Sequence, residues 1–148
     1  MLFVCTGNYY RSRTAEELFN YWAGQKSMDW IADSRGLRED MSQSPNVGPI
    51  SRFAVDFLTQ KEIPILGLDR MPRSLIEEDF ALFDRILCMD EQEHRPMMQA
   101  RFSAYENVVE YWEVRDVQFE SSRVALPLLF QNVEQLVQEL EGTMRSCL

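Results

Sequence analysis

The sequence is poor in the residues on which secreted, nucleic-acid-binding and membrane proteins depend. It has three cysteines in 148 residues, an odd number in a chain long enough to fold without crosslinks, which argues against a secreted disulfide framework. Its 15 basic residues stand against 24 acidic ones, and a formal net charge of −9 argues against partners such as nucleic acid or an anionic membrane. No apolar run approaches the roughly 20 residues that span a bilayer.

What remains is an ordinary globular composition, with 45% hydrophobic and 26% charged residues. The length suits one domain, which we expect to cover residues 1–148. The chain begins in an apolar run, Met-Leu-Phe-Val-Cys, with no charged segment and no signal-length apolar segment before it. These features predict a cytoplasmic protein. The sequence leaves the oligomeric state open.

Hydrophobic periodicity predicts short strands that alternate with helices. Strands are expected at residues 2–4, 30–33, 85–89 and 107–112, with a further extended piece at 63–66. Helices are expected through 15–22 (ending near Gly24), through 50–58 (with Pro49 in the first turn), at 90–102 and around 132–141.

This alternation predicts an α/β fold with a parallel sheet and helices on both faces. Ligands of such sheets bind beyond the carboxyl ends of the strands, where the strand order switches. Chemistry is therefore expected in the residues that follow each strand, which are 5–12, 34–36, Asp90 and 113–116.

The segment 5–12, Cys-Thr-Gly-Asn-Tyr-Tyr-Arg-Ser, joins the first expected strand to the first helix. Backbone N–H groups at a helix N-terminus hold a phosphate-sized anion, and Gly7 is expected to supply the positive φ that such a cradle needs. Arg11 can bind two phosphate oxygens with its planar guanidinium. The helix dipole and Arg11 favour the thiolate of Cys5, and the Ser12 hydroxyl can donate a hydrogen bond to that sulfur.

A lone Cys-x5-Arg pattern is weak in a chain with 13 arginines, and Cys5 by itself could equally be a small buried hydrophobe. The pattern becomes specific because Gly, Asn and Ser stand two, three and seven residues after the cysteine. Its place between an apolar strand and an amphipathic helix adds to that specificity.

The segment resembles the signature V-C-x-G-N-x-C-R-S of the low-molecular-weight protein tyrosine phosphatases. Residues 33–36, Asp-Ser-Arg-Gly, are similar to that family's S-A-G segment. Residues 80–90 resemble its stretch E-D-F-x-x-F-D-x-I-L-C-M-D. The resemblance implies a three-layer α/β fold with a four-stranded parallel sheet and a phosphate-binding loop after the first strand.

The resemblance also implies a phosphomonoester hydrolase of the protein tyrosine phosphatase type, whose nucleophile Cys5 forms a cysteinyl-phosphate. Arg11 would hold the transferred phosphoryl group, and Asn8, Ser12 and Ser34 would support the loop. The implied phosphate-binding residues are Thr6, Gly7, Asn8, Tyr9, Tyr10, Arg11 and Ser12. The implied substrate is a phosphotyrosine protein or a small phosphomonoester, with no metal and no other cofactor.

Expulsion of the leaving group requires a general acid on the same edge of the sheet. Asp116 aligns with the aspartate of the family's Asp-Pro acid loop, although Val117 replaces the proline. Glu113 is a nearby rival, and a solvated Asp116 without a catalytic role is the remaining alternative.

Three further residues and two alternative functions complete the sequence-based interpretation. Tyr10 stands where the family has a second loop cysteine, and Cys88 is expected in the core. His94, the only histidine, is expected to be solvated. One alternative function is a non-catalytic phosphate or phosphoprotein sensor, supported by the altered acid loop. The other is an arsenate reductase, which needs a cysteine relay that is broken because residue 95 is Arg.

Overall fold

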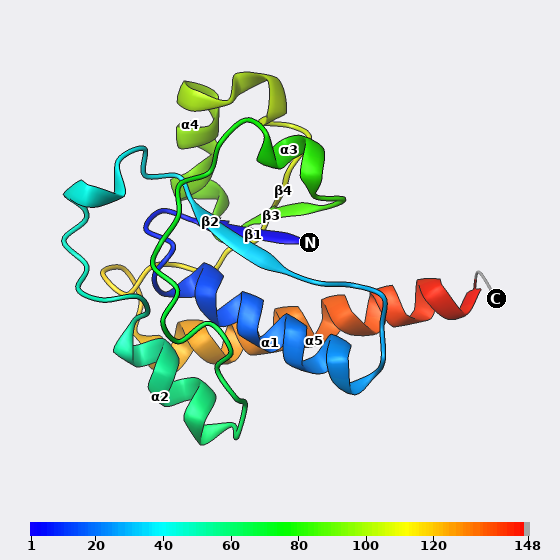
Figure 1. Ribbon diagram of the computed structural model, residues 1–148. Helices are drawn as coiled ribbons and strands as arrows, with labels where there is room; N and C mark the ends of the chain where they lie inside the picture. The colour runs from blue at the N-terminus through cyan, green and yellow to red at the C-terminus, as the bar shows by residue number, and fades with distance from the viewer. Residues whose placement is uncertain (147–148) are drawn as a thin grey trace.

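Four parallel strands form a single sheet in the order β2-β1-β3-β4 (Figure 1). In the computed structural model, which describes residues 1–146 and side chains as far as Met144, the strands are β1 (Leu2–Cys5), β2 (Asp33–Gly36), β3 (Ile86–Cys88) and β4 (Glu110–Tyr111). Cys147 lies outside the described residues. The predicted α/β class with a four-stranded parallel sheet is confirmed.

Helices cover both faces of this sheet. The long α1 (Arg11–Gln25) and α5 (Ser122–Ser146) lie side by side on one face, with α2 (Arg52–Gln60) beside them (Figure 1). The other face carries α3 (Asp79–Leu82) and α4 (Glu91–Arg101). The described residues also form two short 3₁₀ turns, η1 (Met41–Gln43) and η2 (Ser103–Tyr105).

Each face of the sheet has its own hydrophobic core, because side chains along the central strands point alternately to opposite faces. In β1, Phe3 and Cys5 face the α1–α5 side, while Leu2 and Val4 face the α4 side. All four are at most 2% exposed, as a central strand covered on both faces requires. The loop after β1 therefore begins at a strand whose residues are all buried.

The second strand is where the sequence-based prediction was wrong. It runs from Asp33 to Gly36 instead of over residues 30–33. Trp30 and Ala32 precede the strand and pack on the α1–α5 core. The strand itself is polar: the Ser34 hydroxyl accepts a hydrogen bond from Asn8 in the loop after β1, and Arg35 pairs with Asp33 at 2.7 Å. Hydrophobicity therefore did not mark it.

Other boundaries also differ from the predictions. Residues 63–66 form no strand, and β4 has two residues rather than the six predicted. Pro49 does not open α2, whose N-cap is Ser51, with a side chain that accepts a hydrogen bond from the Phe53 N–H at 3.2 Å. α5 begins ten residues before 132 and includes Pro127. Among the described residues, no helix is both long and apolar enough to cross a membrane.

Gly36 is the point at which β2 touches the loop after β1. A Cβ added there would lie 2.6 Å from the Thr6 carbonyl oxygen and 3.0 Å from the Asn8 backbone nitrogen. Both neighbours are backbone atoms of the loop, which cannot move away as a flexible side chain can. The glycine is needed for this close approach.

We predict that Gly36→Ala lowers the free energy of unfolding by about 1–3 kcal/mol, because overpacking forces the loop to shift. Urea denaturation measures the change. Gly24→Ala is the matched control, since a Cβ there meets nothing within 4 Å and an alanine in α1 adds up to about 1 kcal/mol. Equal stability of Gly36→Ala and the wild type would contradict the packing argument.

Candidate active site

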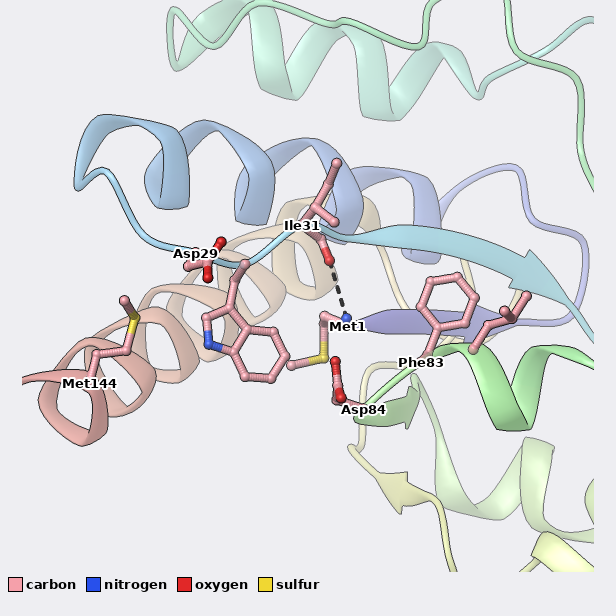
Figure 2. A pocket seen from close by; sticks show the side chains of 8 residues that line it. Met1, Asp29, Ile31, Phe83, Asp84 and Met144 are labelled. Carbon is pink, nitrogen blue, oxygen red and sulfur yellow. Dashed lines mark hydrogen bonds between the residues drawn. The ribbon is translucent and has the colours of Figure 1, made fainter. Parts of the chain in front are cut away.

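Two hollows in the surface compete as the candidate site. The larger, of about 510 Å³, lies at the amino end of β1, where the Met1 amine donates a hydrogen bond to the Ile31 carbonyl at 3.1 Å (Figure 2). Among the described residues that line it, Asp29 and Asp84 carry the charged side chains, so no lining side chain offers an anion a positive charge. It also lies at the wrong edge of a parallel sheet for a ligand site.

The smaller hollow, of about 280 Å³, lies where β1 ends and combines a nucleophile, a cation and a carboxylic acid. Its lining residues are Cys5, Gly7, Tyr9, Tyr10, Arg11, Asn46, Ser51, Phe53, Asp116 and Val117. The loop, the region before α2 and the loop before α5 thus meet at one point. We take this hollow as the candidate active site.

The loop over residues 6–10 turns back on itself through Asn8, whose φ is +49°. The expectation that Gly7 supplies the positive φ was wrong, because Asn8 adopts it instead. Asparagine tolerates this left-handed conformation better than most residues. Within the described part of the chain, the backbone N–H groups of residues 6–10 donate to no protein acceptor, which leaves them available to an anion.

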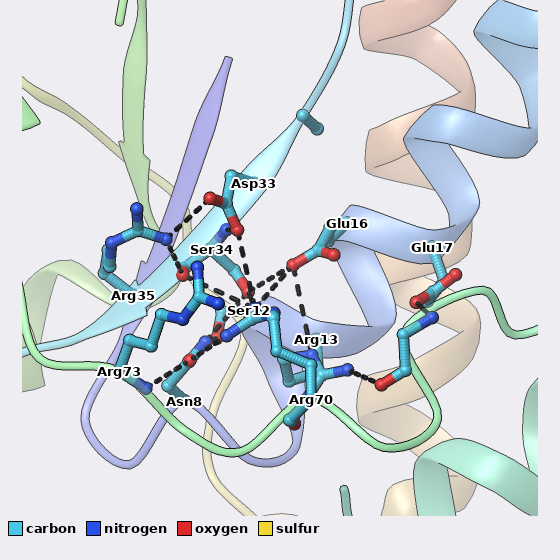
Figure 3. A network of polar contacts seen from close by, with 12 residues as sticks. Asn8, Ser12, Arg13, Glu16, Glu17, Asp33, Ser34, Arg35, Arg70 and Arg73 are labelled. Atoms are coloured by element: carbon cyan, nitrogen blue, oxygen red, sulfur yellow. Dashed lines mark hydrogen bonds and ion pairs between the residues drawn. The ribbon is translucent and has the colours of Figure 1, made fainter. Parts of the chain in front are cut away.

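The Asn8 side chain ties the loop to its surroundings (Figure 3). Its Nδ2 donates to Ser12 Oγ at 3.0 Å and to Ser34 Oγ at 2.8 Å. Its Oδ1 accepts from Arg70 Nη1 at 3.1 Å and from the Arg73 backbone N–H at 3.0 Å. The side chain is fully buried, so every polar atom of the amide is satisfied by protein.

Arg70 extends this network toward α1 and β2 (Figure 3). Its Nη2 donates to Glu16 Oε1 at 2.7 Å and to Ser34 Oγ at 2.6 Å. Arg13, fully buried, donates to the carbonyls of Gly67 and Arg70. These contacts fix the irregular segment after α2 beneath the loop, and Arg13 therefore has a structural role away from the hollow.

Cys5 and Arg11 meet in the hollow with Ser12 beneath them. Cys5 Sγ lies 2.9 Å from Ser12 Oγ. The Arg11 guanidinium is 2% exposed and donates through Nη1 to the Val114 carbonyl at 2.9 Å. Burial lowers the pKa of Arg11, but Cys5 and a hydrogen bond to Glu93 outweigh it and raise the pKa above its ordinary value. The guanidinium is thus a permanent cation beside the sulfur.

Glu93, in the first turn of α4, is a site residue that the sequence analysis missed. Its Oε2 accepts from Arg11 Nη2 at 2.7 Å and from the Thr6 hydroxyl. Burial raises the pKa of Glu93, yet hydrogen bonds from His94 and Arg11 hold that pKa well below its usual range. The side chain is therefore a carboxylate at neutral pH.

His94 is fully buried, so the prediction that it is solvated was wrong. Its Nδ1 accepts from the Asp90 backbone N–H at 3.0 Å, which leaves the Nε2 hydrogen to point at Glu93, 2.9 Å away. Burial lowers the pKa of His94. The ring is a neutral donor that supports Glu93.

Asp116 and Glu113, the two acid candidates, lie in different places. Asp116 lines the hollow with its carboxylate 4.0 Å from Arg11 Nη2, and it accepts from the Val117 backbone N–H at 2.8 Å. Glu113 is exposed and is not among the residues that line the hollow. Of these two candidates, Asp116 is the one that lines the hollow together with Cys5 and Arg11.

Tyr9 and Tyr10 form part of the wall of the hollow. The Tyr9 hydroxyl donates to the Val47 carbonyl at 2.7 Å. Tyr10 is 6% exposed and meets the Phe53 ring edge-on, with centroids 6.3 Å apart. Burial raises the pKa of Tyr10 to about 12, so its hydroxyl stays protonated.

Cys88 is fully buried in β3 and belongs to the core on the α4 side. Burial raises the pKa of its thiol to about 12. Because Cys5 faces the opposite side of the sheet, the two thiols cannot form a disulfide without movement of the backbone.

Comparison with known proteins places these features in one family. The family model "Low molecular weight phosphotyrosine protein phosphatase" matches residues 1–146. The pig (Sus scrofa) protein of that name is 34% identical over 100 residues, which cover 66% of this chain and 58% of the pig protein. A protein-arginine-phosphatase from Bacillus subtilis (strain 168) is 33% identical over 109 residues, 74% of this chain and 67% of the relative.

A solved structure agrees with the sequence comparisons. The low molecular weight protein tyrosine phosphatase from T. tengcongensis is 27% identical and superposes with a TM-score of 0.74. The alignment covers 96% of this chain and 97% of that protein. The similarity therefore extends over the sheet and its helices.

We predict that Asn8→Ala lowers the free energy of unfolding by at least about 2 kcal/mol, since it leaves buried partners unsatisfied, and also weakens the binding of inorganic phosphate. Asn8→Gly should lose about 1 kcal/mol less, because glycine adopts the left-handed conformation without strain. Urea denaturation and isothermal titration with phosphate measure the two effects.

Asn20→Ala is the control for that pair. Asn20 links α1 to Ala32 through two hydrogen bonds, at 3.0 and 2.7 Å, away from the loop. We expect the Asn20→Ala variant to have a lower free energy of unfolding than the wild type and the same affinity for inorganic phosphate. Wild-type phosphate affinity in Asn8→Ala would show that the side-chain network does not shape the cradle.

Proposed function

Because this chain belongs to the low molecular weight phosphotyrosine protein phosphatase family, we propose that it is a phosphatase that hydrolyses phosphomonoesters through a cysteinyl-phosphate on Cys5. The observation that carries the proposal is the meeting of Cys5, Arg11 and Asp116 in one hollow of about 280 Å³. A nucleophile, an anion-binding cation and an acid are the groups that phosphoryl transfer without a metal requires.

In the first step, the Cys5 thiolate attacks phosphorus and the bond from phosphorus to the leaving oxygen breaks. Asp116, in its protonated form, donates its proton to that oxygen. Arg11 and the free N–H groups of residues 6–10 stabilise the charge on the three other phosphoryl oxygens.

In the second step, water attacks the phosphorus of the cysteinyl-phosphate. Asp116, now a carboxylate, takes a proton from that water, and the phosphorus–sulfur bond breaks to release inorganic phosphate. Ser12 Oγ, 2.9 Å from Cys5 Sγ, donates a hydrogen bond to the departing thiolate. The enzyme returns to its starting state with Asp116 protonated.

The walls of the hollow support phosphotyrosine as the substrate. Tyr9, Tyr10 and Phe53 line the hollow together with Cys5, so an aromatic leaving group bound there would contact aromatic side chains. Phosphoarginine is the second candidate, because the B. subtilis relative is named a protein-arginine-phosphatase. Asp116 is the only carboxylate among the described residues that line the hollow, so a guanidinium leaving group has one charged partner there.

The first test is hydrolysis of p-nitrophenyl phosphate between pH 5 and 7.5. We expect Cys5→Ser to abolish turnover, because a hydroxyl does not ionise as a thiol does. We expect Asp116→Ala to lower kcat about 100-fold through the loss of acid catalysis. Steady-state kinetics of each variant provide the measurement.

Glu113→Gln is the matched control, a nearby carboxylate outside the hollow, and it should retain wild-type kcat. A large loss in Glu113→Gln with none in Asp116→Ala would transfer the acid role to Glu113. If the wild-type chain binds phosphate but hydrolyses no ester, the result would instead favour the alternative function, a non-catalytic phosphate or phosphoprotein sensor.

The second test compares two peptides that differ only in carrying phosphotyrosine or phosphoarginine. We expect kcat/KM to be at least about tenfold higher for phosphotyrosine, because one aromatic contact is worth about 0.5–1.5 kcal/mol and several rings line the approach. Phosphate release measures both rates. A higher value for phosphoarginine would identify the chain as an arginine phosphatase.

A further inference from the structure

Glu93 lies in direct contact with Arg11 but is not itself among the residues that line the hollow. It comes from α4, on the opposite side of the sheet from α1, and reaches the end of β1 because α4 starts directly after β3. This contact is unexpected, because the proposed mechanism needs the positive charge of Arg11 for phosphate and Glu93 is a negative group bound to it.

Three donors converge on one oxygen of Glu93. Arg11 Nη2 lies 2.7 Å from Oε2, His94 Nε2 lies 2.9 Å from it, and the Thr6 hydroxyl donates to the same atom. The other oxygen, Oε1, is buried without a hydrogen-bond partner in the described structure. Glu93 is therefore held rigidly by the loop and by its own helix, and it acts on Arg11 from a fixed position.

Arg11 is correspondingly anchored at both terminal nitrogens. Nη1 donates to the Val114 carbonyl at 2.9 Å and Nη2 to Glu93, so the plane of the guanidinium is set by two separate segments of the chain. Its Nε is buried and has no protein partner among the described residues. Nε and the unused hydrogens of the terminal nitrogens are the donors left for phosphoryl oxygens.

We propose that Glu93 is a positioning residue for Arg11, which holds the guanidinium ready for the phosphoryl group and limits how tightly the site binds a phosphate dianion. The proposal rests on the proposed phosphatase function. An arginine fixed before substrate arrives loses less side-chain entropy on binding and meets the transition state in place. The same carboxylate offsets part of the Arg11 charge, which weakens binding of substrate and product alike.

Two variants of Glu93 distinguish its positioning of Arg11 from its effect on phosphate affinity. Glu93→Ala removes the anchor, so we expect kcat for p-nitrophenyl phosphate to fall about 10- to 100-fold. Glu93→Gln keeps an oxygen that accepts from Arg11 but removes the charge. For it we expect kcat within about threefold of the wild type and a dissociation constant for inorganic phosphate about three- to tenfold lower.

Glu91→Gln is the matched control. Glu91 lies in the same turn of α4, is half exposed, and pairs only with Arg95, at 3.0 Å, in the described structure. It loses the same charge outside the site, so kcat and phosphate affinity should both stay at the wild-type level. Thermal unfolding of all three variants shows that the fold is intact before kinetics are compared.

Wild-type kcat in folded Glu93→Ala, or unchanged or weaker phosphate binding in Glu93→Gln, would overturn the proposal. A purely structural role would lower stability and leave the phosphate affinity of the folded protein as it was. Isothermal titration with inorganic phosphate needs no turnover. If the wild-type chain hydrolyses no ester, the proposed function fails, while the phosphate affinity of Glu93→Gln still decides the role of Glu93.

Discussion

The site depends on the side-chain amide of Asn8. This residue holds the left-handed turn of the loop and satisfies both ends of its amide with groups from α1, β2 and the segment after α2. Buried polar groups are costly unless every one is paired, so the network permits one arrangement of the loop. Cys5, Gly7, Tyr9 and Tyr10 then line the same hollow, and Gly36 allows β2 to approach the loop closely.

A second set of contacts fixes the charges. Arg11 is anchored by the Val114 carbonyl, just past β4, and by Glu93 at the start of α4. The segments that follow three parallel strands thus determine the field at the end of β1, as expected for a sheet whose ligands bind beyond its carboxyl ends. In a chain with a net charge of −9, attraction for a phosphate group has to come from this local arrangement.

The sequence was sufficient to predict whatever depends on hydrophobic periodicity or on a local motif. The central strands, the amphipathic α1 and the loop 5–12 all carry such a pattern. β2 was misplaced because its side chains are polar: Ser34 accepts a hydrogen bond from Asn8, and Asp33 and Arg35 form an ion pair instead of burying apolar surface. Glu93 and Arg70 were missed for a related reason: each acts across a long sequence separation, and a charged residue on a polar helix or in an irregular segment looks solvated until the fold brings its partner near.

The alternation of side chains along β1 and β3 also governs recovery from oxidation. Cys5 and Cys88 are free cysteines on opposite faces of the sheet, so they cannot form a disulfide with each other. A sulfenic acid on Cys5 would have to condense with a thiol from outside the described part of the chain, arriving through the hollow beside Tyr9 and Tyr10, and lose water to form a mixed disulfide. A second such thiol would then release the Cys5 thiol from that disulfide. Substrate and reductant share that entrance, so an occupied site is protected from oxidant while it is full and, once oxidised, is repaired only when it is empty.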